Sequence, residues 1–369
     1  MTEKKKNPVL SVIRFILSLI ILVVVLFALF IGLLTLLEYK PADEEEITLT
    51  PASTAETTDA ISTEDEVSVL TWNVGYCGLS ETADFYLDGG TSVISQDEDS
   101  VKNNLMNIEK TIADIDPDVF YLQEVDQDCT RSYGIDQVAD FENNAFPNMA
   151  AAFASNFKVL FIPYPIPPMG HMDAGILTMS KYAIDSATRI QLPCPFSWPL
   201  RVGNLKRCLD VSRVPIEGSD KEFVFVNLHL EAYDDGEGKI AQTKQLAEFM
   251  QAEYDKGNYV VAGGDFNQTF SSVDTSMYPL QSEDLWMCGS LDESMFSENW
   301  QFEMDNSVPS CRSLDRAYDP DDETFQYYMI DGFIVSDNLK VETIETIDQG
   351  FKYTDHNPVK LVVSFKDEK

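Results

Sequence analysis

One uncharged segment near the start of the chain restricts the fold more than any other feature. From Phe15 to Leu37 no residue is charged, and nearly every residue is Leu, Ile, Val or Phe. A helix of this length, rising about 1.5 Å per residue, spans the roughly 30 Å hydrocarbon core of a bilayer with a slight tilt. The run therefore predicts a transmembrane helix over residues 15–37.

Two other interpretations of this segment remain open. A cleaved signal peptide has an apolar region of about 7–15 residues, followed by a small-x-small cleavage site. Here the run is longer and ends in Leu-Leu-Glu-Tyr-Lys, which offers no such site. A helix buried in a soluble core is the other interpretation. The length and the flanking residues favour an uncleaved anchor in a lipid bilayer.

The charges on either side of the segment predict its orientation. Three lysines at residues 4–6 and Arg14 precede it, whereas four acidic residues at 43–46 follow it. Basic residues that flank a membrane helix stay preferentially in the cytoplasm. We therefore expect residues 1–14 to form a cytoplasmic basic N-terminus. Everything after Leu37 is expected outside the cytoplasm, as in a single-pass protein of the cell membrane.

Residues 38–66 have the composition of an acidic linker. They are rich in Thr, Ser, Asp and Glu, contain two prolines and show no apolar periodicity. The chain carries a net charge of −36, and most of it falls on residues 67–369. Proteins that bind nucleic acids usually neutralise phosphates with Lys and Arg. The acidity therefore argues against long duplex DNA as the substrate.

Residues 67–369 are long enough for one large α/β domain. Apolar helix faces are expected at residues 101–115, with Ser100 as the N-cap, and at 239–256, with Gly257 as the stop. Short β-branched or aromatic runs predict strands, several of them buried on both faces. These runs are Val67–Asn73, Val119–Glu124, Ala174–Met179, Cys208–Ile216, Glu222–Leu230, Tyr259–Asp265, Tyr328–Val335 and Pro358–Phe365. The pattern predicts a mixed-sheet sandwich with flanking helices.

Acidic, amide and imidazole side chains gather where these apolar runs end. Each occurrence alone has a simple structural explanation, because Gly-Asp-Phe-Asn and Asp-His-Asn-Pro are ordinary turn sequences. Six occurrences in succession are difficult to attribute to turn chemistry. They are Asn73 in LTWNVG, Glu124 in VFYLQEVD, His229 in FVNLHLEAY, Asp265 and Asn267 in VVAGGDFN, Asp331 in YMIDGFIVS, and Asp355 with His356 in TDHNPV.

This ordered set of motifs resembles the endonuclease/exonuclease/phosphatase superfamily, which includes deoxyribonuclease I, apurinic-site endonucleases, sphingomyelinases and inositol polyphosphate phosphatases. The resemblance covers about residues 67–365. It implies a four-layer α/β sandwich, with two central mixed β-sheets flanked by helices, as the catalytic domain. It also implies a Mg²⁺ or Mn²⁺ site at one edge of the sheets and hydrolysis of phosphoester bonds, as in a phosphodiesterase, nuclease or phosphatase.

The resemblance suggests which residues hold the metal. Glu124 is similar to the principal metal ligand of the superfamily, and Asn73 and Asp355 match residues that lie near it. Oxygen donors of this kind suit a hard divalent cation that keeps several waters and binds a phosphate oxygen.

The remaining motif residues resemble the catalytic group. His229 is similar to the histidine that contacts the scissile phosphate and protonates the leaving oxygen. Asp265 resembles the residue that orients or deprotonates the attacking water, and Asn267 resembles a phosphate contact. Asp331 and His356 resemble an Asp–His pair, in which the carboxylate fixes the tautomer of the imidazole and raises its basicity.

Three further residues are candidates for phosphate contacts. His171 lies on the loop that enters the expected strand beginning near Ala174, while Arg131 and Arg207 are cations in a very acidic domain. Each also has a plain structural interpretation. The histidine fits an exposed loop, and the arginines fit ordinary surface ion pairs.

Two features relate the chain to one side of the superfamily. Gly75 stands two positions after Asn73, where apurinic-site endonucleases have an acidic residue, and they lack the histidine present here as His229. Both point toward the deoxyribonuclease and sphingomyelinase-like members. The substrate class stays open among a lipid head group, a nucleic acid and a small phosphoester. The anchor favours a lipid, because it holds the domain near a bilayer.

Other readings of the domain are a non-catalytic surface binding domain that kept the fold, and a tethered structural protein. Loss of Glu124, Asp265, His229 or His356 would favour the binding domain, and all four are present. A structural role would leave the motif set unexplained. Six cysteines form no C-x-x-C pair, and a domain of this size needs no disulfide. No pattern indicates an obligate protein partner.

Overall fold

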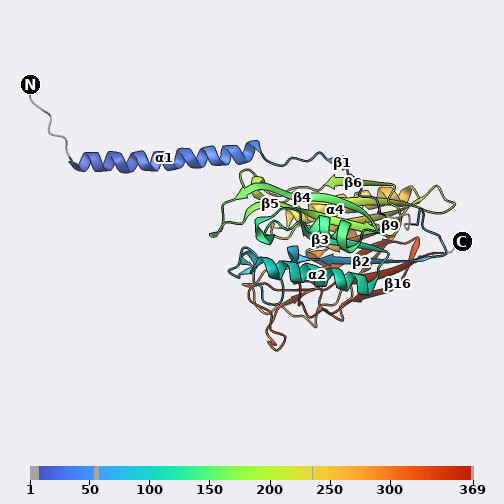
Figure 1. Cartoon of the computed structure of the whole chain (residues 1–369). Coiled ribbons are helices and arrows are strands. Elements are labelled where there is room, and N and C mark those ends of the chain that lie inside the picture. Colours follow the sequence, from blue (N-terminus) through green and yellow to red (C-terminus); the bar gives the residue numbers. More distant parts are fainter. Residues whose placement is uncertain (1–7, 54–57, 235, 367–369) are drawn as a thin grey trace, which may run out of the picture.

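A long apolar helix precedes the folded domain and extends away from it (Figure 1). The computed structural model describes residues 8–53, 58–234 and 236–366. Helix α1 (Pro8–Leu36) is the one helix in these ranges whose length and composition suit a membrane span. It covers nearly all of the expected span. The lysines at 4–6, on which the orientation depends, lie outside the described residues.

Two mixed β-sheets form the centre of the domain. One has seven strands in the order β1 (Glu44–Glu46), β6 (Ser186–Gln191), β7 (Cys208–Pro215), β8 (Glu222–His229), β9 (Tyr259–Asp265), β15 (Asp331–Ser336) and β12 (Trp300–Glu303). The other has six, in the order β16 (Leu339–Thr346), β17 (Val359–Phe365), β2 (Glu66–Asn73), β3 (Val119–Asp126), β5 (Gly170–Ser180) and β4 (Ala150–Ile162). The pairs β2–β3 and β8–β9 are parallel, and the other pairs are antiparallel.

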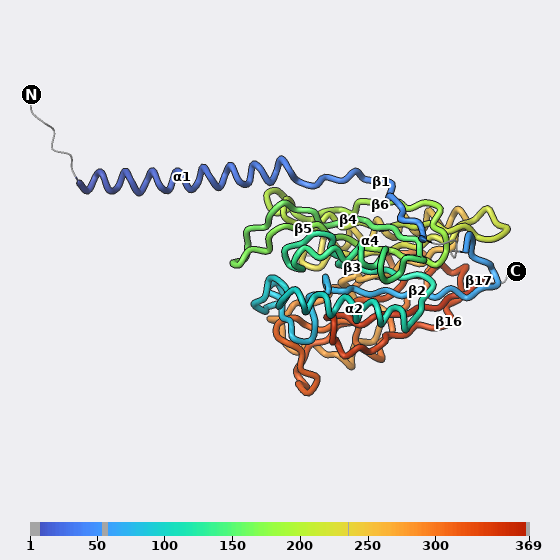
Figure 2. The backbone as a smooth tube through the Cα atoms, viewed as in Figure 1, coloured from blue at the N-terminus to red at the C-terminus, as the bar shows by residue number. Residues whose placement is uncertain are grey.

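Three clusters of apolar side chains separate four layers of secondary structure. The layers follow in the expected order of helix, sheet, sheet and helix. Residues such as Val69 and Phe225 pack between the sheets, and the Tyr121 hydroxyl donates across them to the Val261 carbonyl at 3.0 Å. Helix α2 (Glu98–Ile115) covers the six-stranded sheet, and α4 (Glu237–Asp255) covers the seven-stranded sheet. The backbone trace shows the same stacking (Figure 2). The predicted α/β sandwich is confirmed.

The ends of the two expected helices differ slightly from the sequence-based prediction. The N-cap of α2 is Asp97, whose carboxylate accepts the Ser100 N–H at 2.7 Å, so the prediction of Ser100 as the cap was wrong. Both Asp and Ser can cap a helix, and this helix begins directly after Asp97, the earlier of the two residues. Helix α4 begins two residues before the expected start, and Gly257 follows its end with a φ of +85°.

Further elements complete the domain. The long strand β4 was not expected, because its sequence begins with Ala residues, which are depleted in strands. Two small sheets pair β10 (Gln268–Phe270) with β11 (Gly289–Leu291), and β13 (Cys311–Arg312) with β14 (Tyr327–Tyr328). The short helix α3 (Gln137–Asp140) follows β3.

The segment expected as a linker lies largely against the domain. Strand β1 pairs with β6, and isolated bridges join Thr50 to Ala151 and Ile61 to Ile216. Residues 54–57 lie outside the described residues. Pairing along a sheet edge uses backbone groups alone, so it requires no apolar periodicity in the sequence.

Candidate active site

The candidate residues meet at one edge of the sandwich. Neighbouring strands there are partly antiparallel, so the start of one strand lies beside the end of another. Asn73 is the last residue of β2. Asp331 was expected at the end of a strand, but it is the first residue of β15. The antiparallel pairing of β15 with β9 sets Asp331 directly opposite Asp265. His356 lies just before β17, which pairs antiparallel with β2. The start of β17 therefore lies beside the end of β2, where Asn73 is.

An irregularity in β3 directs Glu124 into the site. The register of β3 against β5 shifts between Leu122 and Val125, and Glu124 has a φ of +56°. A bulge of this kind turns a side chain out of the regular alternation of the strand. A positive φ on a residue with a side chain also stores strain, which is frequent at functional sites.

Asn73 joins the metal-site candidates to the catalytic candidates. Its Nδ2 donates to Asp265 Oδ2 at 3.0 Å and to Glu124 Oε1 at 3.3 Å. Its Oδ1 accepts the Gly75 N–H at 3.0 Å. A side chain at Gly75 would meet the Asp355 and Thr354 side chains at 2.9 Å, and the φ of Gly75 is +50°, so this position favours glycine.

Asp265 lies at the centre of a buried cluster with two histidines. His229 Nε2 is 3.4 Å and His356 Nε2 is 3.8 Å from Asp265 Oδ2. His356 Nδ1 lies 2.8 Å from Asp331 Oδ2, which is the expected Asp–His pair. All four residues are almost completely buried.

Burial and neighbouring charges give the two histidines opposite protonation. Burial, and then the Arg207 charge, lower the pKa of His229 well below its ordinary value. Burial also lowers the pKa of His356, but the acidic neighbours of the imidazole, Asp331 first among them, together outweigh burial and leave that pKa well above its ordinary value. Burial, followed by the Asp331 charge, raises the pKa of Asp265 to about 7. The site therefore holds one neutral and one protonated imidazole beside Asp265.

Asn267 lies in the site but is held by the backbone. Its Nδ2 donates to the Leu230 carbonyl at 2.9 Å, and its N–H donates to Asp265 Oδ1 at 2.8 Å. Its φ is +52°, within the turn that follows β9. Asn267 therefore braces Asp265 in this structure and also lines the cavity described below.

The three candidate phosphate contacts fall into two groups. Arg131 and Arg207 line the cavity, although each has an acidic partner: Arg131 contacts Asp126 at 2.8 Å, and Arg207 contacts Glu231 at 3.3 Å. His171 does not line the cavity. It is partly exposed, and its Nε2 lies 3.7 Å from Asp128.

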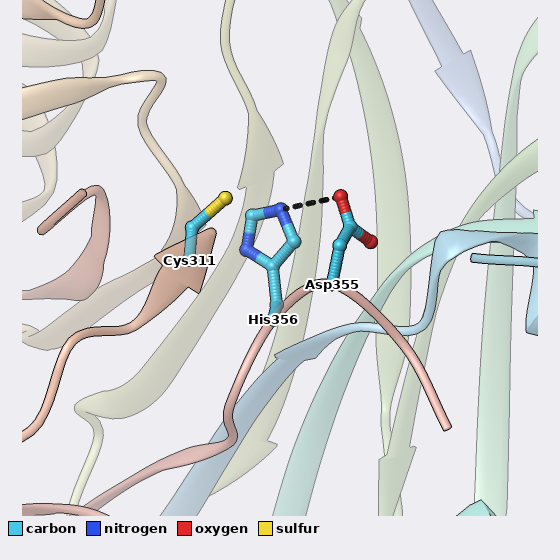
Figure 3. Close-up of side chains that lie close together, drawn as sticks. All are labelled: Cys311, Asp355 and His356. Carbon is cyan, nitrogen blue, oxygen red and sulfur yellow. Dashed lines mark ion pairs between the residues drawn. The ribbon is translucent and has the colours of Figure 1, made fainter. Parts of the chain in front are cut away.

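Two residues that the sequence-based reasoning did not select also line the cavity. Arg312 is buried and bonds only to backbone carbonyls, at 2.8 Å to Ser313 and 2.7 Å to Ser80, and forms no ion pair with any described residue. Cys311 and Asp355 flank the His356 imidazole on opposite sides, with Asp355 Oδ2 3.8 Å from Nε2 (Figure 3). Neither residue follows an apolar run, so strand-end motifs could not reveal them.

A cavity of about 500 Å³ opens over this cluster. Its base carries Glu124, Asp265, Asp355 and both motif histidines, and most of its wall is apolar or aromatic. The wall includes residues from segments far apart in the chain, among them Leu79, Phe85, Ile162, Phe196, Leu200 and Trp286. The polar base would face the reacting group, and the wall would contact an apolar part of a ligand.

Comparison with known proteins identifies the family. A model of the Endonuclease/Exonuclease/phosphatase family matches residues 70–346. The chain belongs to this family. Its members are generally phosphoester hydrolases. No curated protein sequence matches the chain.

Several solved structures are similar to this chain in fold. An endonuclease/exonuclease/phosphatase from Beutenbergia cavernae has a TM-score of 0.54 and 17% identity, covering 81% of this chain and 72% of that one. One from Bacteroides vulgatus has a TM-score of 0.53 and 15% identity, covering 82% and 100%. The human Nocturnin catalytic domain with bound sulfate has a TM-score of 0.50 and 15% identity, covering 82% and 94%. At such low identity the likeness concerns the fold alone.

Proposed function

We propose that this protein is a membrane-tethered, divalent-metal-dependent hydrolase of phosphoester bonds that acts outside the cytoplasm. The observation that carries the proposal is the buried cluster of Asp265, His229 and His356 at the base of a cavity, with Asp331 behind His356. Glu124 and Asp355 line the same base. Hydrolysis of a phosphoester requires charge neutralisation, an oriented water and proton transfer, and these residues can supply each.

The donor set at the base fits Mg²⁺ or Mn²⁺. Glu124 and Asp355 are close enough that the Glu124 charge contributes, after burial, to a raised pKa of Asp355. A divalent cation held by these carboxylates, with Asn73 beside them, would remove this repulsion, and hard oxygen donors suit such an ion. When bound, the cation would polarise a phosphate oxygen.

Four residues of the chain would carry out the remaining parts of the reaction. Asp265 would orient the attacking water and accept its proton as the water oxygen bonds to phosphorus, while the bond to the leaving oxygen breaks and that oxygen takes up a proton from the His356 imidazolium. The His356 imidazolium, held by Asp331, would offer positive charge and a proton near the reacting phosphate. His229 is neutral in the free protein, so it would donate a hydrogen bond to the phosphate. Arg312, which has no carboxylate partner among the described residues, would contribute further positive charge.

A purified full-length protein tests this function directly. We expect it to hydrolyse methyl p-nitrophenyl phosphate, a soluble diester, with added Mg²⁺ or Mn²⁺, and to stop when EDTA is added. Restoring the metal should restore the rate, which separates chelation from unfolding. Equal turnover with EDTA present would remove the metal mechanism, and absence of turnover with either metal on diesters and monoesters would refute the hydrolase.

A further inference from the structure

Two loops present large apolar side chains to solvent beside the anchor. The β4–β5 hairpin exposes Ile166, at 92%, and the loop between β6 and β7 exposes Trp198, at 56%. We call the exposed apolar residues of these loops the apolar rim: Leu160, Phe161, Tyr164, Ile166, Trp198 and Leu200. Both loops contact α1 and line the same cavity, and large apolar side chains exposed together on a soluble domain mark an interaction surface.

The last turns of the anchor contact this rim. The Phe30 ring of α1 lies edge-on to the Phe161 ring with centroids 6.4 Å apart, and Trp198 Nε1 donates to Thr35 Oγ1 at 3.1 Å. Figure 1 shows α1 extending beyond the same end of the domain from which the β4–β5 hairpin protrudes. A bilayer that surrounds α1 would therefore begin close to the tips of both loops.

Ion pairs and strand pairing fix this relation between the anchor and the domain. Glu38, just after α1, pairs with Arg201 at 3.3 Å and with Lys206 at 3.4 Å. Strand β1 then joins β6 six residues later. The segment between helix and domain is therefore attached to the domain and does not act as a free tether over this stretch.

The charge of the two loops also suits a lipid surface. The protein has a net charge of −36, yet residues 159–170 contain no charged residue, and residues 192–205 contain Arg201 as their one charged residue. Carboxylates in a loop would carry a desolvation cost at a lipid interface, and these two loops contain none. Apolar side chains with Trp and Tyr are typical of membrane interfaces.

The rim also borders the candidate active site. Tyr164 and Leu200 of the rim line the cavity whose base holds Asp265 and His356, and the neighbouring loop residues Ile162 and Phe196 line it as well. A lipid that entered from the rim would therefore meet an apolar wall before its phosphate reached the polar base.

We propose that the apolar rim docks on the bilayer that holds α1, and that the cavity receives phosphoesters carried by lipids of that bilayer. The docking depends on the rim alone. The substrate class rests additionally on the proposed hydrolase function. Docking would make the bilayer the source of substrate, with the apolar part of the lipid against the cavity wall and its phosphate at the base.

Tryptophan fluorescence in vesicles tests the docking without reference to activity. The full-length protein would be reconstituted in phosphatidylcholine and phosphatidylglycerol vesicles that contain brominated phosphatidylcholine. Because Trp198 lies close to the anchor, the probe is placed at the hairpin tip by Ile166→Trp in a Trp198→Phe background. Met277→Trp in the same background is the control, since Met277 is 67% exposed and lies outside the rim and the cavity. We expect bromine to quench the tryptophan at 166 and not the one at 277.

Two esters with one leaving group test the substrate class. Methyl p-nitrophenyl phosphate is delivered from water, and hexadecyl p-nitrophenyl phosphate is delivered from the vesicles. We expect Ile166→Asp to slow hydrolysis of the hexadecyl ester at least about tenfold, equivalent to about 1.4 kcal/mol, and to leave the methyl ester unchanged. Met277→Asp should change neither rate. Thermal unfolding of each variant confirms that it is folded.

Each remaining outcome separates this inference from the proposed function. Hydrolysis of the methyl ester without the hexadecyl ester, or an equal loss on both esters in Ile166→Asp, would overturn the lipid source and leave the hydrolase standing. Failure of the wild type on both esters and on the monoester p-nitrophenyl phosphate would refute the hydrolase, and the quenching result would then decide the docking alone. Absence of quenching at position 166 would overturn the docking.

Discussion

At the scale of single residues, the site depends on how Asp265 is surrounded. A buried carboxylate beside Asp331 would be strongly disfavoured as an anion if no cation were near. His356 lies 3.8 Å from Asp265 Oδ2 and is the cationic histidine, whereas His229 at 3.4 Å is neutral. The cluster therefore balances two carboxylates with one imidazolium, and a neutral hydrogen-bonding group remains for the substrate.

Asp265→Asn should lower kcat at least about 100-fold, the usual range for loss of a positioned acid–base group. Folding should be retained, because an amide is less costly to bury than a carboxylate. The matched control is Asp210→Asn. Asp210 is also a fully buried carboxylate of the same sheet, bonded to Ser212 at 3.1 Å, but it does not line the cavity. Steady-state kinetics and thermal unfolding measure both; equal losses of activity in the two variants would contradict a specific role for Asp265.

Arg312→Gln should raise KM for a phosphodiester about tenfold or more while kcat changes less, because Arg312 lines the cavity and no carboxylate among the described residues neutralises its charge. Arg312→Lys, which retains the charge, should recover part of the affinity. Arg316→Gln is the control, since Arg316 is paired with Asp315 and with Asp322 at 2.7 Å. If all three variants had the KM of the wild type, Arg312 would have no role in phosphate binding.

At the scale of secondary structure, apolar runs in the sequence predict the positions of the main strands well. They predict poorly how the strands pair and in which direction each one runs. The runs ending at Asn73 and Asp265 predict β2 and β9, and their motifs identify the residues that meet at the site. The start of β15 at Asp331 could not be predicted, because the direction of a neighbouring strand is not written in its own residues. Strand β1 shows the same limit, since edge pairing uses backbone groups.

The same limit applies to the cavity. The polar residues at its base belong to the sequence motifs. The residues of its wall, such as Leu79, Ile162 and Trp286, lie far apart in the chain and share no sequence pattern. Arg312 similarly follows no apolar run, and it was proposed as a phosphate contact because it forms no ion pair with any described residue. Such features depend on tertiary contacts alone.

Glu253→Gln should destabilise the domain at neutral pH, by about 1–2 kcal/mol, because a buried hydrogen-bonded charge pair would lose one partner. Glu253 of α4 accepts two hydrogen bonds from Arg213, at 2.8 and 2.9 Å, and one from Asn258. Burial alone would raise its pKa, but the bonds from Arg213, Lys256 and Asn258 lower it to about 2.

The lowered pKa also sets the sign of the pH dependence. A carboxylate with a depressed pKa stabilises the fold above its ordinary pKa, and this contribution is lost as the pH falls toward 2. The difference in free energy of unfolding between the wild type and Glu253→Gln should therefore shrink in acid. Glu248→Gln, in an exposed pair with Lys244 on the same helix, should have almost no effect. Urea unfolding at several pH values measures this; a difference that grows in acid would contradict the assignment.

At the scale of the whole molecule, the segment between the apolar helix α1 and the acidic domain holds the two together. A net charge of −36 favours separation from an anionic membrane, whereas Glu38 and β1 attach the domain beside the end of α1. The apolar rim lies at this junction. The proposed function requires in addition that the domain emerges outside the cytoplasm, as the flanking charges predict.

The orientation is therefore the decisive property at this scale. In intact cells, protease added outside should degrade the catalytic domain, and a tag at the N-terminus should stay protected and membrane-bound. Replacing the three lysines at 4–6 with Glu should reduce the degraded fraction, because basic residues within about 15–20 residues of a membrane helix determine its orientation. Replacing Lys102, Lys110 and Lys244 with Glu changes the net charge equally but lies far from α1, so it should leave the orientation unchanged. A domain that is protected in the wild type would place it in the cytoplasm, and a released domain without the tag would show that the apolar segment is a cleaved signal peptide.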